Sequence, residues 1–331
     1  MRIGIISFAH MHAYSYAHCI RRNPHAELVG IADENEERGK AAARQFGVDW
    51  VADYRSLLEQ DIDAVVICSE NARHAEQTVA AARAGKHILC EKPIAATLEE
   101  GKAMIEAAES NGVKLMIAFP CRFHPVAQRM REQVANGMFG AILAMNGTNR
   151  GSMPGGWFVD ASQSGGGAVM DHTVHVLDVM RWMMPGAEVK EVYAEADTLF
   201  HPVDIDDSGL LTFEFDNGVI ASLDPSWSRS ASFPVWGDVT FEIVGTRGVC
   251  RTDLYKQNIT LHSDDTMKTT RENWGADPDQ EMIDAFVDCV RLDAPPPVTG
   301  LDGLRALEVA LWAYQSSRTG QPVGRSSWNG G

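Results

Sequence analysis

The sequence predicts an α/β protein of two domains: a doubly wound parallel sheet in residues 1–120, then an α+β domain with a mainly antiparallel, open-faced sheet in residues 121–331. Up to about Phe119, short apolar runs alternate with helical patterns, which is typical of βαβ units. After Phe119, apolar runs follow one another with tight connections, as in antiparallel sheets. A chain of 331 residues is also long for one hydrophobic core, which favours two domains.

The elements of the first domain follow from bounded apolar runs and from helix-ending residues. Strands buried on both faces show such runs in place of an alternation. They are expected at Ile3–Phe8, Leu28–Ala32, Ala64–Cys68, Ile88–Cys90 and Leu115–Phe119. One helix is expected from Asn71, as its capping residue, to about Ala84, and another from Leu98 to about Asn111; a glycine follows each of them.

The second domain is expected to contain a sheet built largely from hairpins. Asp216-Asn217-Gly218, between two apolar runs, is a strong hairpin signal. The expected strands lie near Ala141–Gly147, Val189–Ala196, Gly209–Phe215, Val219–Trp227, Val239–Gly245 and Val249–Leu254. An amphipathic helix is expected from Asp302 to about Thr319. An antiparallel sheet of this kind can leave one face open for a partner subunit.

Composition restricts the partners and the compartment. The formal net charge of −16 repels phosphate backbones and anionic lipids, so neither nucleic acid nor membrane is expected as a partner. The six cysteines are scattered without a CxxC pair, which indicates buried thiols in a reducing compartment. Strand residues follow Arg2 directly, so no signal peptide is expected, and no apolar run is long enough to cross a bilayer. We therefore expect a cytoplasmic protein.

The stretch His87-Ile88-Leu89-Cys90-Glu91-Lys92-Pro93 places a lysine at the carboxyl end of a predicted strand. Ligands bind at that edge of open α/β sheets, so Lys92 is a candidate for binding or chemistry. Pro93 disfavours a helical conformation of Lys92 and so keeps it in the turn. The alternative is a solvated lysine in an ordinary turn.

The first strand-to-helix turn is where a dinucleotide-binding Rossmann domain carries Gly-x-Gly-x-x-Gly. Here Ser7, Ala9 and His12 occupy the three glycine positions. Ser7 and Ala9 are small, and a serine hydroxyl can donate to a phosphate, whereas His12 is bulky. Because the N-terminus of a helix attracts anions whatever its side chains, we still expect the pyrophosphate there, with Phe8 and His10 also near the cofactor.

Asp33 ends the second predicted strand, about 20 residues after the loop, where an acid commonly accepts hydrogen bonds from the ribose. A carboxylate there repels a 2′-phosphate, so NAD is preferred over NADP. The alternative is that Asp33 caps the helix expected over Glu34–Phe46, and one side chain can serve both purposes.

A glycine run, Gly165-Gly166-Gly167, precedes a helical pattern that carries Asp171, His175 and Asp178. Glycine allows the chain to turn closely against a ligand. Asp171 and His175 stand at positions i and i+4, hence on one helical face. An aspartate beside a histidine orients the ring and raises its basicity, as a general base requires. The alternative is a structural His–Asp pair.

Glu91-Lys92-Pro93 after an apolar strand and Gly-Gly-x-x-x-x-Asp-x-x-x-His resemble the two signatures of the Gfo/Idh/MocA oxidoreductases, the glucose–fructose oxidoreductase and inositol dehydrogenase family. The resemblance spans nearly the whole chain. It implies an N-terminal domain that binds NAD(P) and a second domain that binds substrate and forms homodimers or homotetramers through its sheet. It also implies that Asp171 and His175 bind a sugar and transfer its proton. The chain departs from the family at the glycine-poor loop and at Glu70, where proline is common.

Combining the residues with the resemblance gives two expected sets. The residues expected at the cofactor are Ser7, Phe8, Ala9, His10, His12, Asp33, Ser69, Asn71, His74, Glu91 and Lys92. The residues expected at the substrate are Lys92, Arg122, His124, Trp157, Asp171, His172 and His175.

The expected function is an NAD-dependent dehydrogenase of a secondary hydroxyl in a sugar, sugar acid or cyclitol. In this reaction His175 takes the hydroxyl proton, Lys92 stabilises the developing alkoxide, and Asp171 orients the base or the substrate. A rival is a metal-dependent hydrolase or lyase that gathers His10, His12, His172 and His175, because imidazoles suit divalent ions. A third class, a cofactor-binding regulator without catalysis, is disfavoured by the presence of both Lys92 and His175. We expect no bound metal.

Overall fold

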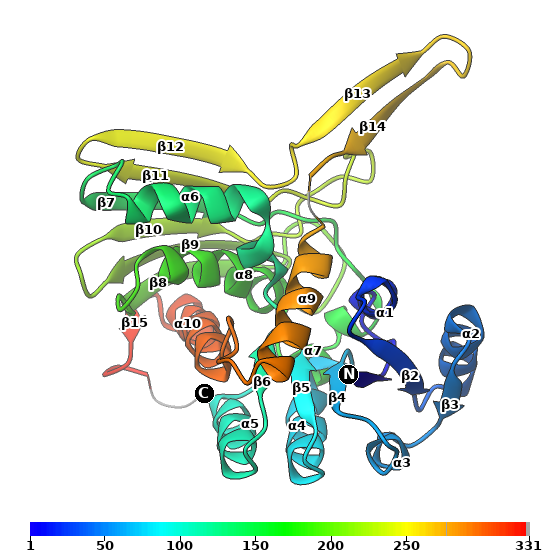
Figure 1. Ribbon diagram of the computed structural model, residues 1–331. Helices are drawn as coiled ribbons and strands as arrows, with labels where there is room; N and C mark the ends of the chain where they lie inside the picture. Colours follow the sequence, from blue (N-terminus) through cyan, green and yellow to red (C-terminus); the bar gives the residue numbers. More distant parts are fainter. Residues whose placement is uncertain (276, 329–331) are drawn as a thin grey trace.

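The structure is a computed structural model that describes residues 1–275 and 277–328, without the side chains of residues 271–273. Two sheets dominate it, and a long hairpin projects from the body (Figure 1). The first sheet is parallel throughout, in the order β3-β2-β1-β4-β5-β6. Its strands are β1 (Arg2–Ile6), β2 (Glu27–Ala32), β3 (Asp49–Val51), β4 (Ala64–Ile67), β5 (His87–Cys90) and β6 (Leu115–Ile117). The doubly wound sheet predicted from the sequence is therefore confirmed.

The helices of the first domain are α1 (His12–Arg22), α2 (Glu36–Phe46), α3 (Tyr54–Leu58), α4 (His74–Arg83) and α5 (Leu98–Ser110), with a 3₁₀ turn, η1 (Asn71–Arg73). The prediction that Asn71 caps a helix is wrong, because its side-chain amide donates instead to the carbonyl of Ser164 at 2.8 Å. Helix α5 does begin with a capping box between Thr97 and Glu100. Sequence analysis missed β3 and α3, which are too short to show a pattern.

The second sheet has the order β12-β11-β7-β10-β9-β8-β15 and is antiparallel except between β7 and β10. Its strands are β7 (Ile142–Thr148), β8 (Val189–Asp197), β9 (Ser208–Phe215), β10 (Ile220–Asp224), β11 (Thr240–Gly245), β12 (Gly248–Asp253) and β15 (Val323–Gly324). Figure 1 shows α6 (Pro125–Ala135), α8 (Ala168–Met183) and α10 (Gly300–Thr319) gathered along one face of this sheet. The mainly antiparallel sheet predicted from the sequence is confirmed.

Two of the larger features of the second domain were not predicted. One is the projecting hairpin of β13 (Asn258–Ser263) and β14 (Lys268–Asn273), whose strands pair only with each other. The other is α9 (Pro278–Arg291), which packs against α1 of the first domain. The remaining short elements are η2 (Pro120–Phe123), η3 (Gly156–Val159) and α7 (Ala161–Ser164).

The cysteines are unpaired and mostly buried, as the composition predicts. Each of the six cysteines is free, and five of them are buried. Among the described residues, no helix has the length and apolarity that crossing a bilayer requires.

A buried ion pair ties the linking segment to the second domain. Arg122, in η2, donates to both carboxylate oxygens of Asp178, in α8, at 2.6 and 2.5 Å, and lies 3.1 Å from Asp302 of α10. Both members of the first pair are buried. Arg122 therefore serves to join η2, α8 and α10.

Replacing Asp178 with alanine should destabilise the fold by about 3 kcal/mol, because it leaves Arg122 buried with only Asp302 as a carboxylate partner. Urea unfolding measures the change as a lower midpoint. A matched control is Asp288→Ala, which breaks an exposed pair with Arg291 and should cost less than ~1 kcal/mol. Equal losses in the two variants would contradict a structural role for the buried pair.

Candidate active site

A cavity of about 430 Å³ lies where the two domains meet. Its walls come from the start of α1, the end of β5, helix α8, the segment before β11 and the start of α9. Lys92, Asp171 and His175, the three predicted catalytic residues, all line it. The sequence motifs from the two halves of the chain therefore meet at one place.

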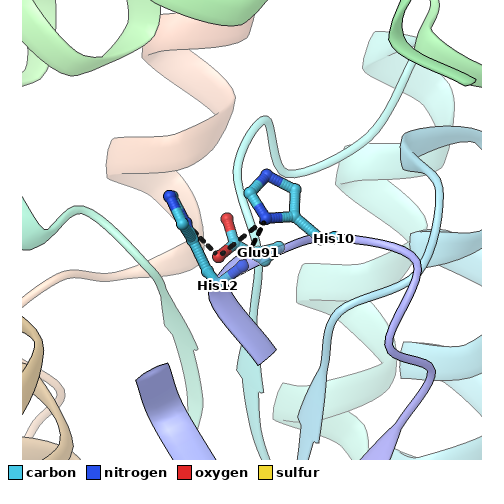
Figure 2. A group of neighbouring side chains, drawn as sticks. All are labelled: His10, His12 and Glu91. Atoms are coloured by element: carbon cyan, nitrogen blue, oxygen red, sulfur yellow. Dashed lines mark hydrogen bonds and ion pairs between the residues drawn. The ribbon is translucent and has the colours of Figure 1, made fainter. Parts of the chain in front are cut away.

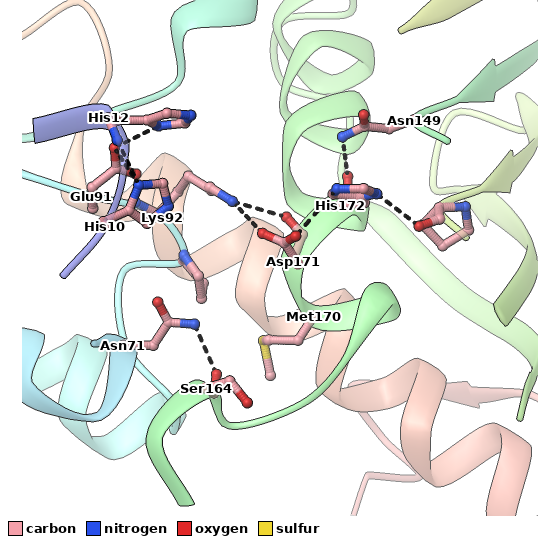
Figure 3. A network of polar contacts seen from close by, with 12 residues as sticks. His10, His12, Asn71, Glu91, Lys92, Asn149, Ser164, Met170, Asp171 and His172 are labelled. Carbon is pink, nitrogen blue, oxygen red and sulfur yellow. Dashed lines mark hydrogen bonds and ion pairs between the residues drawn. The ribbon is translucent and has the colours of Figure 1, made fainter. Parts of the chain in front are cut away.

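Lys92 stands at the carboxyl end of β5, as predicted, and is 4% exposed. Its ammonium group donates to Oδ1 of Asp171, at the start of α8 (Figure 3). The other carboxylate oxygen of Asp171 accepts from the indole of Trp227 at 3.2 Å and lies 3.2 Å from Nε2 of His172. Burial opposes the charge of Asp171, but Lys92 and His172 hold the pKa of this carboxyl well below its usual value. An ion pair thus spans the two domains at the floor of the cavity.

His175 lies one turn further along α8. The predicted pairing of its ring with Asp171 is not formed, because that carboxylate is turned toward Lys92 and Trp227. Its Nδ1 is buried without a hydrogen-bond partner among the described residues. Burial, together with the charge of Lys92, lowers the pKa of His175 well below its usual value. The ring is therefore neutral near pH 7 and can accept a proton.

The start of α8 is fixed by two residues that sequence analysis missed. The carboxylate of Asp206 accepts from the amides of Gly167 and Val169 at 2.9 and 2.8 Å. The hydroxyl of Tyr314 accepts from the amides of Gly167 and Met170 and donates to Asp206. A Cβ on Gly167 would lie 1.9 Å from the carbonyl oxygen of Asp206, so the position requires glycine. Nothing in the local sequence around Asp206 or Tyr314 indicates this role, since their partners are far away along the chain.

The dinucleotide loop keeps part of the expected geometry despite its missing glycines. Ser7 has φ of 69°, the left-handed conformation that normally favours glycine, and its hydroxyl accepts from the amide of Ala9 at 3.1 Å. His12 begins α1 with its ring turned toward Glu91. A second cavity, of about 280 Å³, is lined by residues that include Ser7, Asp33 and Arg73. These features fit a dinucleotide that runs from this cavity past the start of α1.

Asp33 is more heavily engaged than the sequence suggests. Its carboxylate accepts from the amides of Phe8 and Asn35 and forms a two-point ion pair with Arg38, at 2.8 Å for both contacts. The alternative that Asp33 caps the following helix is wrong, because Asn35 caps α2. A ribose hydroxyl that donates to Asp33 must therefore compete with Arg38.

The histidines gather at the cavity, but in a different grouping from the one predicted. His10, His12, His172 and His175 all line it. The side chains close enough to share an ion are instead His10, His12 and Glu91, whose ligand atoms lie within 4.8 Å of one another (Figure 2). Nδ1 of His12 is 2.8 Å from Glu91, while Nδ1 of His172 faces the carbonyl of Pro225 at 2.9 Å.

The electrostatics of this group favour an ion pair. Burial disfavours a charged ring at both histidines, but Glu91 raises the pKa of His12, whereas burial prevails at His10 and lowers its pKa to about 3. His12, whose protonated form Glu91 favours, therefore provides the carboxylate with a partner beside a neutral His10.

Of the remaining residues predicted to contact substrate or cofactor, some line a cavity and others bond elsewhere in the protein. His124 lines the main cavity. Arg122 is held by Asp178, and Trp157 donates from its indole to the carbonyl of Ala9 at 3.1 Å, so it lies against the dinucleotide loop. On the first domain, the side chains of three predicted cofactor residues bond other parts of the protein; they are Ser69, Asn71 and His74.

A doubly wound sheet with a lysine at the end of β5, facing an aspartate and a histidine of a second domain, defines a two-domain, dinucleotide-dependent oxidoreductase. The chain belongs to the GFO/IDH/MocA family. Residues 1–119 match its "Oxidoreductase family, NAD-binding Rossmann fold" and residues 127–251 match its "GFO/IDH/MocA C-terminal domain".

Relatives support the assignment along the full chain. The chain is 34% identical to the uncharacterized oxidoreductase YrbE of Bacillus subtilis, over 92% of this chain and 91% of that one. It is 28% identical to the scyllo-inositol 2-dehydrogenase (NAD(+)) of B. subtilis, over 98% and 96%. Among solved structures, levoglucosan dehydrogenase in complex with NADH and levoglucosan superposes with a TM-score of 0.83 at 27% identity, over 98% and 99% of the two chains.

Purified protein should contain no stoichiometric metal, and chelators should leave its activity unchanged, because Glu91 already has His12 as a partner. Elemental analysis measures the metal content. Finding one zinc per chain that is lost in a Glu91→Gln variant would contradict this prediction.

Proposed function

We propose that this protein is a dehydrogenase that transfers a hydride from a secondary hydroxyl of a sugar, sugar acid or cyclitol to NAD. The observation that carries the proposal is the meeting of Lys92, Asp171 and His175 in one cavity beside the dinucleotide loop. Relatives named as sugar and inositol dehydrogenases support the substrate class. The rival reading, a metal-dependent hydrolase or lyase, has no support from these relatives.

The residues of the cavity divide the chemistry among them. The bound nicotinamide supplies the hydride acceptor. His175, neutral and without a partner, accepts the hydroxyl proton. Lys92 stabilises the negative charge that develops on the same oxygen, and Asp171 fixes the direction of the ammonium group. This role for Asp171 differs from the orientation of His175 that the sequence suggested.

The most direct test is a screen of sugars, sugar acids and cyclitols for the production of NADH. One positive result identifies the reaction class, the cofactor and a substrate together. If no member of the three classes supports reduction of NAD or NADP, the proposal is wrong.

His175→Ala should lower kcat by ~10²–10⁴, the usual contribution of a positioned general base, with little change in NAD affinity. Lys92→Ala should be comparably damaging, and Lys92→Arg should rescue little, because a planar guanidinium does not reproduce the ammonium geometry. Steady-state kinetics on the best substrate measures all three. If His175→Ala and Lys92→Ala keep nearly full kcat, both residues are structural.

The pH profile provides a separate check on His175. A base whose pKa is lowered is active above that pKa, and activity is lost as the pH falls through it. The acid limb of kcat/KM should therefore lie below pH ~6.5, the ordinary value for histidine, and should shift or vanish in His175→Ala.

The preference for NAD rests on Asp33, which lies at the second cavity. A 2′-phosphate near a carboxylate is repelled. Arg38 weakens this effect, because its guanidinium neutralises Asp33 and is able to bind a phosphate. The balance between the two side chains therefore sets the size of the preference.

NAD should bind at least ~10-fold more tightly than NADP, a difference of about 1.4 kcal/mol. Asp33→Ser should narrow this ratio and Arg38→Ala should widen it, because each removes one side of the balance. Fluorescence titration of the unaltered protein and the two variants with both cofactors measures the three ratios needed. Equal affinities in the unaltered protein would reject the assignment of Asp33.

We further propose a homodimer or homotetramer formed through the open face of the second sheet. Three apolar side chains on that face are exposed by 37 to 60%: Tyr193, Leu210 and Ile220. Such a patch on a sheet is a typical subunit contact.

We also propose a cytoplasmic location, because all six cysteines are free and free thiols are typical of a reducing compartment.

A further inference from the structure

Most of the charged side chains that line the main cavity form ion pairs with neighbouring side chains of opposite charge. Lys92 lines the cavity and is paired with Asp171, and His12 lines it in contact with Glu91. Asp277, at its rim, is paired with Arg22 at 2.7 Å. Asp279 also lines the cavity and has no cationic partner within ion-pair distance among the described residues; its carboxylate accepts from the hydroxyl of Ser15. Burial raises the pKa of Asp279, and the nearby His12 opposes that rise. Among the described residues of the lining, Asp279 is therefore the carboxylate left without an ion-pair partner.

No arginine is among the described residues that line the cavity. Arginine is the usual partner of carboxylates and phosphates, because its two parallel N–H groups match their geometry. Arg122 is held by Asp178, as described above. Arg150 and Arg229 pair with Asp238, and Arg150 also lies 4.0 Å from Asp224. Within the described lining, an anionic ligand would therefore meet no guanidinium.

The uncommitted polar groups of the lining suit hydroxyls. Burial lowers the pKa of His10, His124 and His175, so these rings are neutral near pH 7. Nε2 of His10 is unpartnered and carries the ring proton, because Nδ1 accepts from the amide of His12. The side-chain oxygen of Asn149 is buried and unpartnered, and it can only accept. A hydroxyl both donates and accepts, whereas a carboxylate only accepts and would be repelled by that oxygen.

Apolar side chains form the rest of the wall. They include Phe158, Val239 and Leu254, which are all buried, and Trp236, whose ring lies 5.0 Å from that of His172. An apolar wall removes water from a ligand without replacing its hydrogen bonds, and this costs much more for a charged group than for a neutral one.

We propose that this site binds an uncharged polyhydroxylated ring and discriminates against the same ring when it carries a carboxylate or phosphate. The inference rests on the proposed function and narrows its substrates, removing sugar acids. Asp279 is the residue assigned to this discrimination, because its carboxylate lines the cavity with a hydroxyl, and no cation, as its direct partner.

The test uses matched pairs that differ in one charged group: glucose with glucuronate, galactose with galacturonate, and myo-inositol with myo-inositol 1-phosphate. Calorimetry measures their affinity for the NADH-loaded protein at one ionic strength, and kcat/KM with NAD is measured in parallel. The neutral member should bind at least ~10-fold more tightly. Equal or tighter binding of the charged members would overturn the inference.

The two readouts separate this inference from the proposed function. If neutral members bind better but no pair is oxidised, the charge discrimination holds and the dehydrogenase proposal falls. If a charged member binds and is oxidised as well as its neutral counterpart, the dehydrogenase proposal holds and the inference falls. If no member binds, both are contradicted.

The variant Asp279→Asn tests whether this one side chain causes the difference in affinity between neutral and charged ligands. The amide still accepts from Ser15 but carries no charge, so the ratio of neutral to charged affinity should fall several-fold. Asp264→Asn is the control, because it removes the same charge from the turn of the β13–β14 hairpin, outside the cavity lining. Equal changes in the two variants would show that the overall charge of the chain is responsible, and would reject the assignment to Asp279.

Discussion

The ion pair between Lys92 and Asp171 is the interaction on which the site depends. It joins the edge of the first sheet to a helix of the second domain, with both partners nearly out of contact with solvent. Either charge alone in this position would be strongly disfavoured, so the two domains are held in the relation that brings them together. Burial, together with the charge of Lys92, keeps His175 neutral, and the same pairing turns the Asp171 carboxylate away from the His175 ring. One contact thus determines the position of the cation and leaves the base without a carboxylate partner.

Much of the fold was predictable because its signals are local. The parallel strands, the capping box at Thr97 and the lysine at the end of β5 each depend on residues that are adjacent or one turn apart. The hairpin β13–β14 was missed because β13 has no buried apolar face and hence no clear alternation. Local patterns therefore gave the layers of the molecule more reliably than its projecting parts.

The sequence predicted which residues form the site but not which of them bond to one another. Lys92, Asp171 and His175 do line one cavity, whereas the partner of Asp171 proved to be Lys92 in place of His175. Arg122 looked like a substrate contact but bonds Asp178, and Asp33 is shared with Arg38. Each of these outcomes depends on how a long side chain turns among several possible partners. Sequence spacing restricts which residues share a helical face but does not determine that choice.

The burial of the cysteines makes thiol chemistry a reporter of the native state. Desolvation raises the pKa of every cysteine in the chain, and that of Cys19 and Cys289 to about 11, while the thiolate is the form that reacts with alkylating reagents. Cys250, the least buried, is the one accessible first. Intact protein should thus consume reagent slowly, and the rate at which the remaining thiols are labelled measures how often the molecule opens.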